Sequence, residues 1–265
     1  MRARVKDYFA CAPSILVGVF LALFSWSVAN AEEVDLELVL ALDASGSINE
    51  REFLLQLEGT ARAFEAPQVQ HAITSGPIGR IAVSVLIWSD ATFPKIKSDW
   101  YVLNSVETAQ DFASIVRNFL STTQRTPGPS AGGTGIGAGI EVALRMIETN
   151  DHVGARRIID VSGDGVETDP RTNSVIRLPQ ARALAEARGV LINGLPIQTV
   201  EHPFLDEYFV EHVISGPGAF VVTAFGFNDF ARAIREKLLS EISSRIAERP
   251  QSKPKGLTVL AGYKR

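Results

Sequence analysis

Short apolar runs alternate along the chain with stretches of helical periodicity, and this alternation constrains the fold more than any other feature. A short apolar run is typical of a strand covered on both faces, whereas apolar residues at helical spacing indicate a helix that buries one side. The patterns predict strands at 36–42, 81–88, 100–103, 157–161, 190–195 and 219–224, and helices at 47–66, 112–119, 136–147, 178–187, 204–213 and 227–246. This order predicts an α/β fold with one doubly wound, mostly parallel sheet.

The composition suits one globular domain with a sizeable core. The chain has 265 residues, of which 46% are hydrophobic and 21% are charged, and that length is enough to bury a large apolar core. Lys and Arg number 26 against 30 Asp and Glu, for a net charge of -4. Because the sequence contains no long basic run that could bind along a phosphate backbone, we expect no nucleic acid partner.

Residues 1–31 have the features of a secretory signal peptide. Three basic residues precede the apolar run 15–24, and Ala29 and Ala31 form a small-x-small cleavage site. The alternative is an uncleaved anchor, but the run is about half of the ~20 apolar residues that a spanning helix needs. We therefore expect cleavage after Ala31 and no membrane span thereafter.

The cysteine content indicates the compartment. The single cysteine, Cys11, lies inside the predicted signal peptide, so the remaining chain would have no disulfide, no thiolate nucleophile and no cysteine-based zinc site. An exported chain without cysteine suits a bacterial periplasm or exterior. We expect a periplasmic or secreted bacterial protein with one domain over residues 32–249 and a basic tail over 250–265.

Three polar loops lie beside ends of the predicted elements. Asp43–Ser47 follows the first strand, Gly132–Gly135 precedes the helix at 136–147, and Ser162–Gly165 follows the strand at 157–161. In an open parallel sheet, ligands gather beyond the carboxyl ends of the strands, so these loops are expected to meet. Together they offer two carboxylates and several hydroxyls, a hard oxygen donor set that suits Mg²⁺.

These residues resemble the metal-ion-dependent adhesion site of the von Willebrand factor type A family. Asp43, Ser45 and Ser47 match its Asp-x-Ser-x-Ser pattern, Thr134 matches the distant Thr, and Asp164 is the candidate for the distant Asp. The resemblance covers roughly residues 35–248. The chain without its signal peptide is similar to small exported bacterial proteins of this superfamily.

The resemblance implies a fold, a cation and a partner. It implies a doubly wound sheet with one antiparallel edge strand, and a bound Mg²⁺, with Mn²⁺ or Ca²⁺ as alternatives, held by the five matching residues. It also implies that a carboxylate of a protein partner fills an open position on the ion. A binding module rather than an enzyme is therefore expected.

The third loop departs from the family pattern. The family usually has Thr or Ser directly before Asp-Gly, whereas here Gly163 stands between Ser162 and Asp164. This insertion leaves Asp160 and Glu167 as alternative acids for the third position. It also leaves open a structural domain whose metal site is vestigial.

Other functional classes have weaker support. Residues 133–138 satisfy the relaxed dinucleotide pattern G-x-G-x-x-A, but no strand precedes them, as that fingerprint requires. A metal-assisted hydrolase is the alternative function, with Asp160, Glu167 and Asp169 as candidate general bases.

A second ion site is a further alternative. It would use the acids and histidines between residues 201 and 212, namely Glu201, His202, Asp206, Glu207, Glu211 and His212. Such a cluster is more often a solvated face.

Overall fold

The computed structural model describes residues 31–92, 94–119, 133–168 and 176–244. The predicted signal segment, apart from Ala31, and the predicted tail at 250–265 lie outside these ranges, so the domain boundaries stay predictions. Within the described ranges, no helix is long and apolar enough to cross a membrane.

A single six-stranded sheet forms the centre of the domain. Its strands run in the order β4-β3-β2-β7-β8, and β5 also pairs with β3. The parallel strands are β2 (Leu36–Asp43), β3 (Ile81–Trp88), β7 (Arg157–Gly163) and β8 (Leu191–Pro196). Two short strands, β4 (Ile96–Lys97) and β5 (Tyr101–Leu103), pair antiparallel with β3. The predicted sheet with an antiparallel edge is therefore confirmed, and two short strands share that edge.

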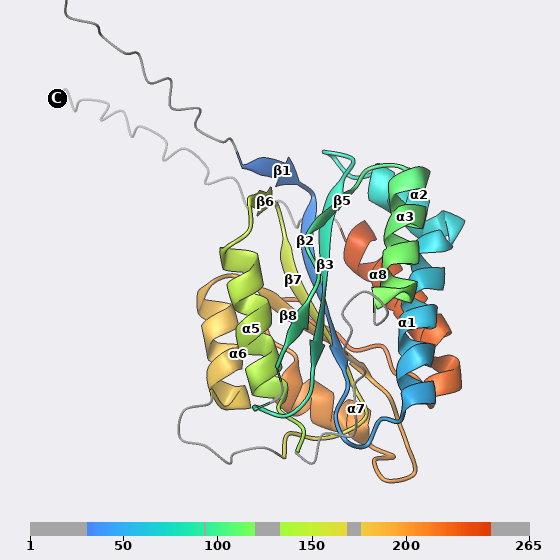
Figure 1. The fold of residues 1–265 in the computed structure, drawn as a ribbon. Coiled ribbons are helices and arrows are strands. Elements are labelled where there is room, and N and C mark those ends of the chain that lie inside the picture. The colour runs from blue at the N-terminus through green and yellow to red at the C-terminus, as the bar shows by residue number, and fades with distance from the viewer. Residues whose placement is uncertain (1–30, 93, 120–132, 169–175, 245–265) are drawn as a thin grey trace, which may run out of the picture. The chain divides into compact units, whose positions relative to one another are not determined.

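Helices cover both faces of the sheet (Figure 1). One face carries α1 (Glu50–Glu65), α2 (Pro67–Thr74), α3 (Val106–Arg117) and α8 (Phe230–Ser243), the last preceded by the 3-10 turn Phe227–Asp229. The other face carries α5 (Ile136–Glu148), α6 (Leu178–Ala187), and α7 (Leu205–Tyr208), which continues as the π-helical turn Phe209–Val213. The doubly wound arrangement follows from this two-sided cover.

The alternation of side chains along β2 explains its continuous apolar sequence. Leu38 and Leu40 belong to the core cluster beneath α1, α3 and α8, whereas Val39 and Ala41 belong to the cluster beneath α5 and α6. Successive residues of a strand point to opposite faces, so a strand covered on both sides has no position for a solvated side chain.

Two segments differ from the sequence-based expectation. Pro67 was expected to end the first helix, but it also opens α2, because proline fits the first turn of a helix where its missing N–H is not needed. The expected strand at 219–224 is reduced to isolated parallel bridges of Val221 with Gly194 and of Ala224 with Ile197. The segment lies beside β8 but does not pair with it regularly. It comes after two glycines with positive φ, Gly216 and Gly218.

Both ends of the described chain lie at the amino-terminal edge of the sheet. The short strand β1 (Glu32–Val34) pairs with β6 (His152–Gly154) just before β7 begins. At the same edge, the Arg156 guanidinium donates hydrogen bonds to the carbonyl oxygens of Glu241 and Ile242 in the last turn of α8. The loops that follow β2 and β7 lie at the opposite edge (Figure 1).

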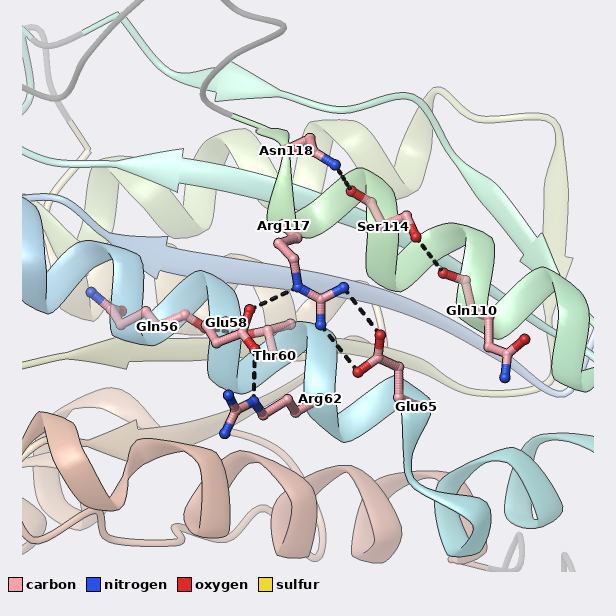
Figure 2. Close-up of polar contacts among 9 residues, drawn as sticks. All are labelled: Gln56, Glu58, Thr60, Arg62, Glu65, Gln110, Ser114, Arg117 and Asn118. Atoms are coloured by element: carbon pink, nitrogen blue, oxygen red, sulfur yellow. Dashed lines mark hydrogen bonds and ion pairs between the residues drawn. The ribbon is translucent and has the colours of Figure 1, made fainter.

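An ion-pair network joins α1 to α3 on the outer surface. Figure 2 shows Arg117 of α3 between two acids of α1, with 2.7 Å to Glu58 and 3.0 Å to Glu65. Glu58 also pairs with Arg62 at 2.6 Å. The hydrogen bond that Arg117 donates to Glu58 lowers the pKa of the Glu58 carboxyl.

Candidate metal centre

Three chain segments meet at the carboxyl edge of the sheet. Asp43 is the last residue of β2, Asp164 follows directly on β7, and Thr134 lies just before the first turn of α5. Parallel strands bring their carboxyl ends to one edge, which is why residues so far apart in sequence become neighbours. The structure therefore places the five predicted site residues at one end of the sheet.

Asp43 is fully buried and only half satisfied. Its Oδ1 accepts a 2.7 Å hydrogen bond from the Ser45 N–H, whereas no hydrogen bond to its Oδ2 is found among the described residues. The Gln56 side chain donates to the Asp43 carbonyl oxygen at 3.0 Å and fixes the backbone there. Burial, and then the nearby Asp164 carboxylate, raise the pKa of Asp43 well above its usual value. Hydrogen bonds from Ser45 and from the Asp164 backbone oppose this rise, but no cationic side chain in the described part of the chain offsets it.

Hydroxyl groups connect Asp43's loop to Asp164. The Ser47 hydroxyl donates to Asp164 Oδ1 at 2.7 Å, and the Ser45 and Ser47 oxygens are 3.2 Å apart. Burial raises the pKa of Asp164, although the hydrogen bond from Ser47 opposes this rise. Two carboxylates and two hydroxyls thus form one contiguous group of oxygens.

Gly163 leaves room for the Asp43 carboxylate. A Cβ on Gly163 would lie 2.9 Å from Asp43 Oδ2, closer than real Cβ contacts come. Gly163 is still part of β7 and continues its pairing with β8, where its partner is Pro196. Asp164 still lies against Ser47 despite this glycine, and a side chain at position 163 would require the Asp43 carboxylate to move.

The two alternative acids are engaged elsewhere. Asp160 forms a 2.8 Å ion pair with Lys237 of α8, inside the core. Glu167 Oε2 accepts a 3.1 Å hydrogen bond from the Gly137 N–H at the start of α5. The described structure thus places Asp164, rather than either alternative, against Ser47. The same contacts disfavour Asp160 and Glu167 as general bases, and Asp169 lies outside the described residues.

Thr134 is held by a residue that the sequence analysis missed. Its N–H donates to the Thr168 hydroxyl at 2.7 Å, and the Thr168 N–H donates to the Thr134 carbonyl at 3.0 Å. The Thr134 hydroxyl lies 3.5 Å from where a Cβ on Gly165 would be, beside Asp164. Thr168 carries no sequence signal beyond its closeness to the third loop.

Gln56 was also missed, although a signal was present. It lies on the buried side of α1, between Phe53 and Thr60, and has no exposed surface. A buried polar side chain needs hydrogen-bond partners, so a glutamine in an apolar helical stripe indicates a specific contact. That contact is the Asp43 carbonyl.

The glycines of the dinucleotide-like pattern serve packing. A Cβ on Gly135 would lie 3.0 Å from the Ala91 nitrogen, and one on Gly137 would lie 2.6 Å from the Leu178 nitrogen. Both glycines therefore allow the start of α5 to approach neighbouring backbone, which accounts for the pattern without a nucleotide.

The expected alternative ion site between residues 201 and 212 does not form. Among the described residues, no group of three or more His, Cys, Asp or Glu side chains is arranged to hold a metal. His202 instead turns toward the Asp43 edge, with Nε2 3.9 Å from the position of a Cβ on Gly165.

The donor set at the Asp43 edge fits a hard divalent cation. It offers the carboxylates of Asp43 and Asp164 and the hydroxyls of Ser45, Ser47 and Thr134. Oxygen ligands of this kind suit Mg²⁺, Mn²⁺ and Ca²⁺. A cation would also supply the partner that Asp43 Oδ2 lacks.

Solved structures share this fold. The proximal thread matrix protein 1 from the mussel byssus, with a zinc-occupied MIDAS motif, is 19% identical over 81% of this chain and 47% of that chain, with a TM-score of 0.53. The pilus adhesin SpaC from Lactobacillus rhamnosus GG is 12% identical over 80% of this chain and 31% of that one, with a TM-score of 0.52. The vWF domain of the type V pili tip protein Mfa5 from Porphyromonas gingivalis is 9% identical over 78% and 95%, with a TM-score of 0.50.

These similarities concern the fold, and a comparison with sequence families identifies the family. The chain spans about half the length of the mussel protein, and no curated protein matches it. The similarity to solved type A domains confirms the resemblance drawn from the sequence. A family profile matches residues 33–246. The chain therefore belongs to the family described as "Protein of unknown function (DUF1194)", and its fold is that of a von Willebrand factor type A domain.

Proposed function

We propose that this protein is an exported adhesion module that binds a divalent cation and captures an acidic group of a protein partner through it. The cation is Mg²⁺, held by Asp43, Ser45, Ser47, Thr134 and Asp164. Its open coordination position accepts a carboxylate of the partner. The basic and apolar start of the chain supports export to the periplasm or the exterior.

The buried Asp43 Oδ2 without a hydrogen bond carries this proposal. A buried carboxylate oxygen without a donor is costly, and a second carboxylate nearby increases that cost. A divalent cation between Asp43 and Asp164 would attract both carboxylates and so offset both costs. Two carboxylates balance the formal charge of the ion without exceeding it, and the other three donors are neutral hydroxyls, so the ion stays electrophilic enough to accept a further carboxylate oxygen from outside.

The relatives support adhesion as the purpose of such a site. The mussel protein is described with a zinc-occupied MIDAS motif, and SpaC and Mfa5 are described as a pilus adhesin and a pilus tip protein. We extend the metal-dependent contact from these proteins to this chain as part of the proposal.

Calorimetric titration of Mg²⁺ and Mn²⁺ into the purified protein tests the site. We expect saturable binding by the wild type and none by D43A, which removes the buried carboxylate. D111N is the matched control, because Asp111 is exposed on α3, away from the carboxyl edge. Equal binding by D43A and the wild type would overturn the assignment of the site.

Partner capture has its own test. Immobilised wild-type protein should retain proteins from an extract of cell-surface proteins when Mg²⁺ is present, and EDTA should release them. D43A should retain none of the proteins that EDTA releases from the wild type. Esterase and phosphatase assays with and without EDTA test the hydrolase alternative, for which turnover that EDTA abolishes would be required.

A further inference from the structure

A groove opens beside the candidate metal centre. It has a volume of about 650 Å³ and lies between the first turns of α1, the loop after β8 and the segment that leads into α8. Its walls include Asn49, Glu52 and Leu55 on one side and Val200, Phe225 and Phe227 on the other. The groove thus occupies the same edge of the sheet as Asp43 and Asp164.

Large apolar side chains are exposed along this groove. Val200 is 96% exposed and Phe225 is 72% exposed, and both line it. Phe204, which is 69% exposed, directly follows the lining residue Pro203. Apolar side chains that gather beside a polar site usually mark a surface that a partner covers.

The groove neighbours the candidate metal centre, although none of the five proposed ligands lines it. Glu52 lines the groove, and its charge also acts on the Asp164 carboxyl. The loop after β8 spans both features, because His202 points toward Gly165 while Val200 and Pro203 line the groove. A chain held by its carboxylate at the ion would therefore continue over Val200 and Phe225.

The charges of the groove restrict what fits there. Glu52 and Glu201 face it, against the single cation Arg51 among its lining residues. A second acidic side chain on the partner would meet these carboxylates and be repelled. An apolar side chain would instead bury its surface against the exposed phenyl ring of Phe225.

We propose that the groove selects the partner: it binds a protein segment in which one carboxylate, held at the ion, is flanked by a bulky apolar side chain and by no second acid. This specificity rests on the proposed function, since the ion anchors the carboxylate. The groove supplies the selectivity that the ion alone lacks.

Selection from a display library of peptides with one fixed central Asp and random flanks tests this inference. Wild-type protein is immobilised in Mg²⁺ and bound peptides are eluted with EDTA. We expect enrichment of Phe, Tyr, Trp, Leu or Ile at one fixed distance from the Asp, and depletion of Asp and Glu. Absence of an apolar preference, or of any enrichment, overturns the proposal.

A double variant locates the contact. V200S/F225S should bind the best peptide at least about tenfold more weakly than the wild type, with unchanged Mg²⁺ affinity in calorimetry. V106S/V153S is the control, because Val106 and Val153 are also exposed apolar residues, at 52% and 54%, but lie outside the groove. Equal loss in both variants, or no loss in V200S/F225S, contradicts the assignment.

Two further outcomes have separate meanings. Wild-type protein that binds no Mg²⁺ sinks the proposed function as well, whereas intact Mg²⁺ binding without apolar selectivity sinks only the groove. Sedimentation should show a monomer in both variants and the wild type. A wild-type dimer that V200S/F225S dissociates would assign the groove to self-association and overturn the proposal.

Discussion

The hydroxyl of Ser47 donates a 2.7 Å hydrogen bond to Oδ1 of Asp164, a residue 117 positions further along the chain. This bond ties the loop after β2 to the loop after β7 at the carboxyl edge of the sheet. Ser47 is exposed whereas Asp164 is buried, so a cation that arrives from solvent meets the hydroxyl and the carboxylate together.

Substitution of Gly163 by alanine should weaken cation binding with little loss of fold. The new methyl group would lie 2.9 Å from Asp43 Oδ2 and push that carboxylate away from Asp164. Overpacking of this kind costs about 1–3 kcal/mol. We expect at least about a tenfold loss of Mg²⁺ affinity in calorimetry, with an unchanged circular dichroism spectrum.

G165A is the comparison for that variant. A methyl group there would meet nothing closer than the Thr134 hydroxyl at 3.5 Å, an ordinary contact. Its Mg²⁺ affinity should stay within about threefold of the wild type, which is below 1 kcal/mol. Equal losses in G163A and G165A would contradict the close-approach role of Gly163.

Stability should fall as the pH rises from about 4 toward 7, because of Asp160. Burial raises the pKa of Asp160 to about 7 from the usual 3.8, against the opposing effect of Lys237. The folded state then holds a proton that the unfolded state has released, so between pH 3.8 and about 7 the free energy of unfolding decreases by up to about 1.4 kcal/mol per pH unit. Above pH 7 this contribution is lost completely. Urea denaturation at several pH values measures the slope, and D160N should flatten it; an identical slope in D160N contradicts the prediction.

Lys237 should be one of the most sensitive positions of the core. Its ammonium has no exposed surface and pairs with Asp160 at 2.8 Å and with Glu241 at 2.5 Å. Above the Asp160 pKa of about 7, K237M leaves two buried carboxylates without a cation, which costs about 3–5 kcal/mol. Urea denaturation measures this loss. R235M, at an exposed position of the same helix, should change stability by less than about 0.5 kcal/mol, and similar losses in both variants would be against the buried-charge explanation.

Arg117 should matter far less, although it also pairs with two carboxylates. Its side chain is 35% exposed where it contacts Glu58 and Glu65 (Figure 2), and exposed pairs contribute up to about 1 kcal/mol because water and salt screen them. R117A should lose no more than that, and the difference should shrink in 1 M NaCl, where the screening length is about 3 Å. A loss above about 2 kcal/mol that salt does not change would contradict this account.

The regular elements could be predicted because their patterns are local. The strand at 81–88 and the helix at 178–187 agree with β3 and α6 to the residue, since buried apolar runs and helical stripes are written in consecutive residues. The segment at 219–224 could not be assigned in this way. Its apolar residues fit a strand, but the pairing depends on how β8 and two flexible glycines place it.

The site was predicted at the level of its acids and hydroxyls but not of its supports. Asp43, Ser47 and Asp164 form a spaced motif, and the structure brings them together, while their ligation of a metal stays a prediction. Thr168 could not be found, because its role is a pair of backbone hydrogen bonds to Thr134 that only the folded chain creates. Gly163 was taken as a disturbance, since the sequence does not show that Asp43 lies against it.

The pairing of β1 with β6 and the hold of Arg156 on the last turn of α8 have a consequence for presentation. Both ends of the described chain leave from the edge of the sheet farthest from Asp43. A domain attached to a surface or to a neighbouring domain through either end would point the loops of Asp43 and Asp164 away from that attachment.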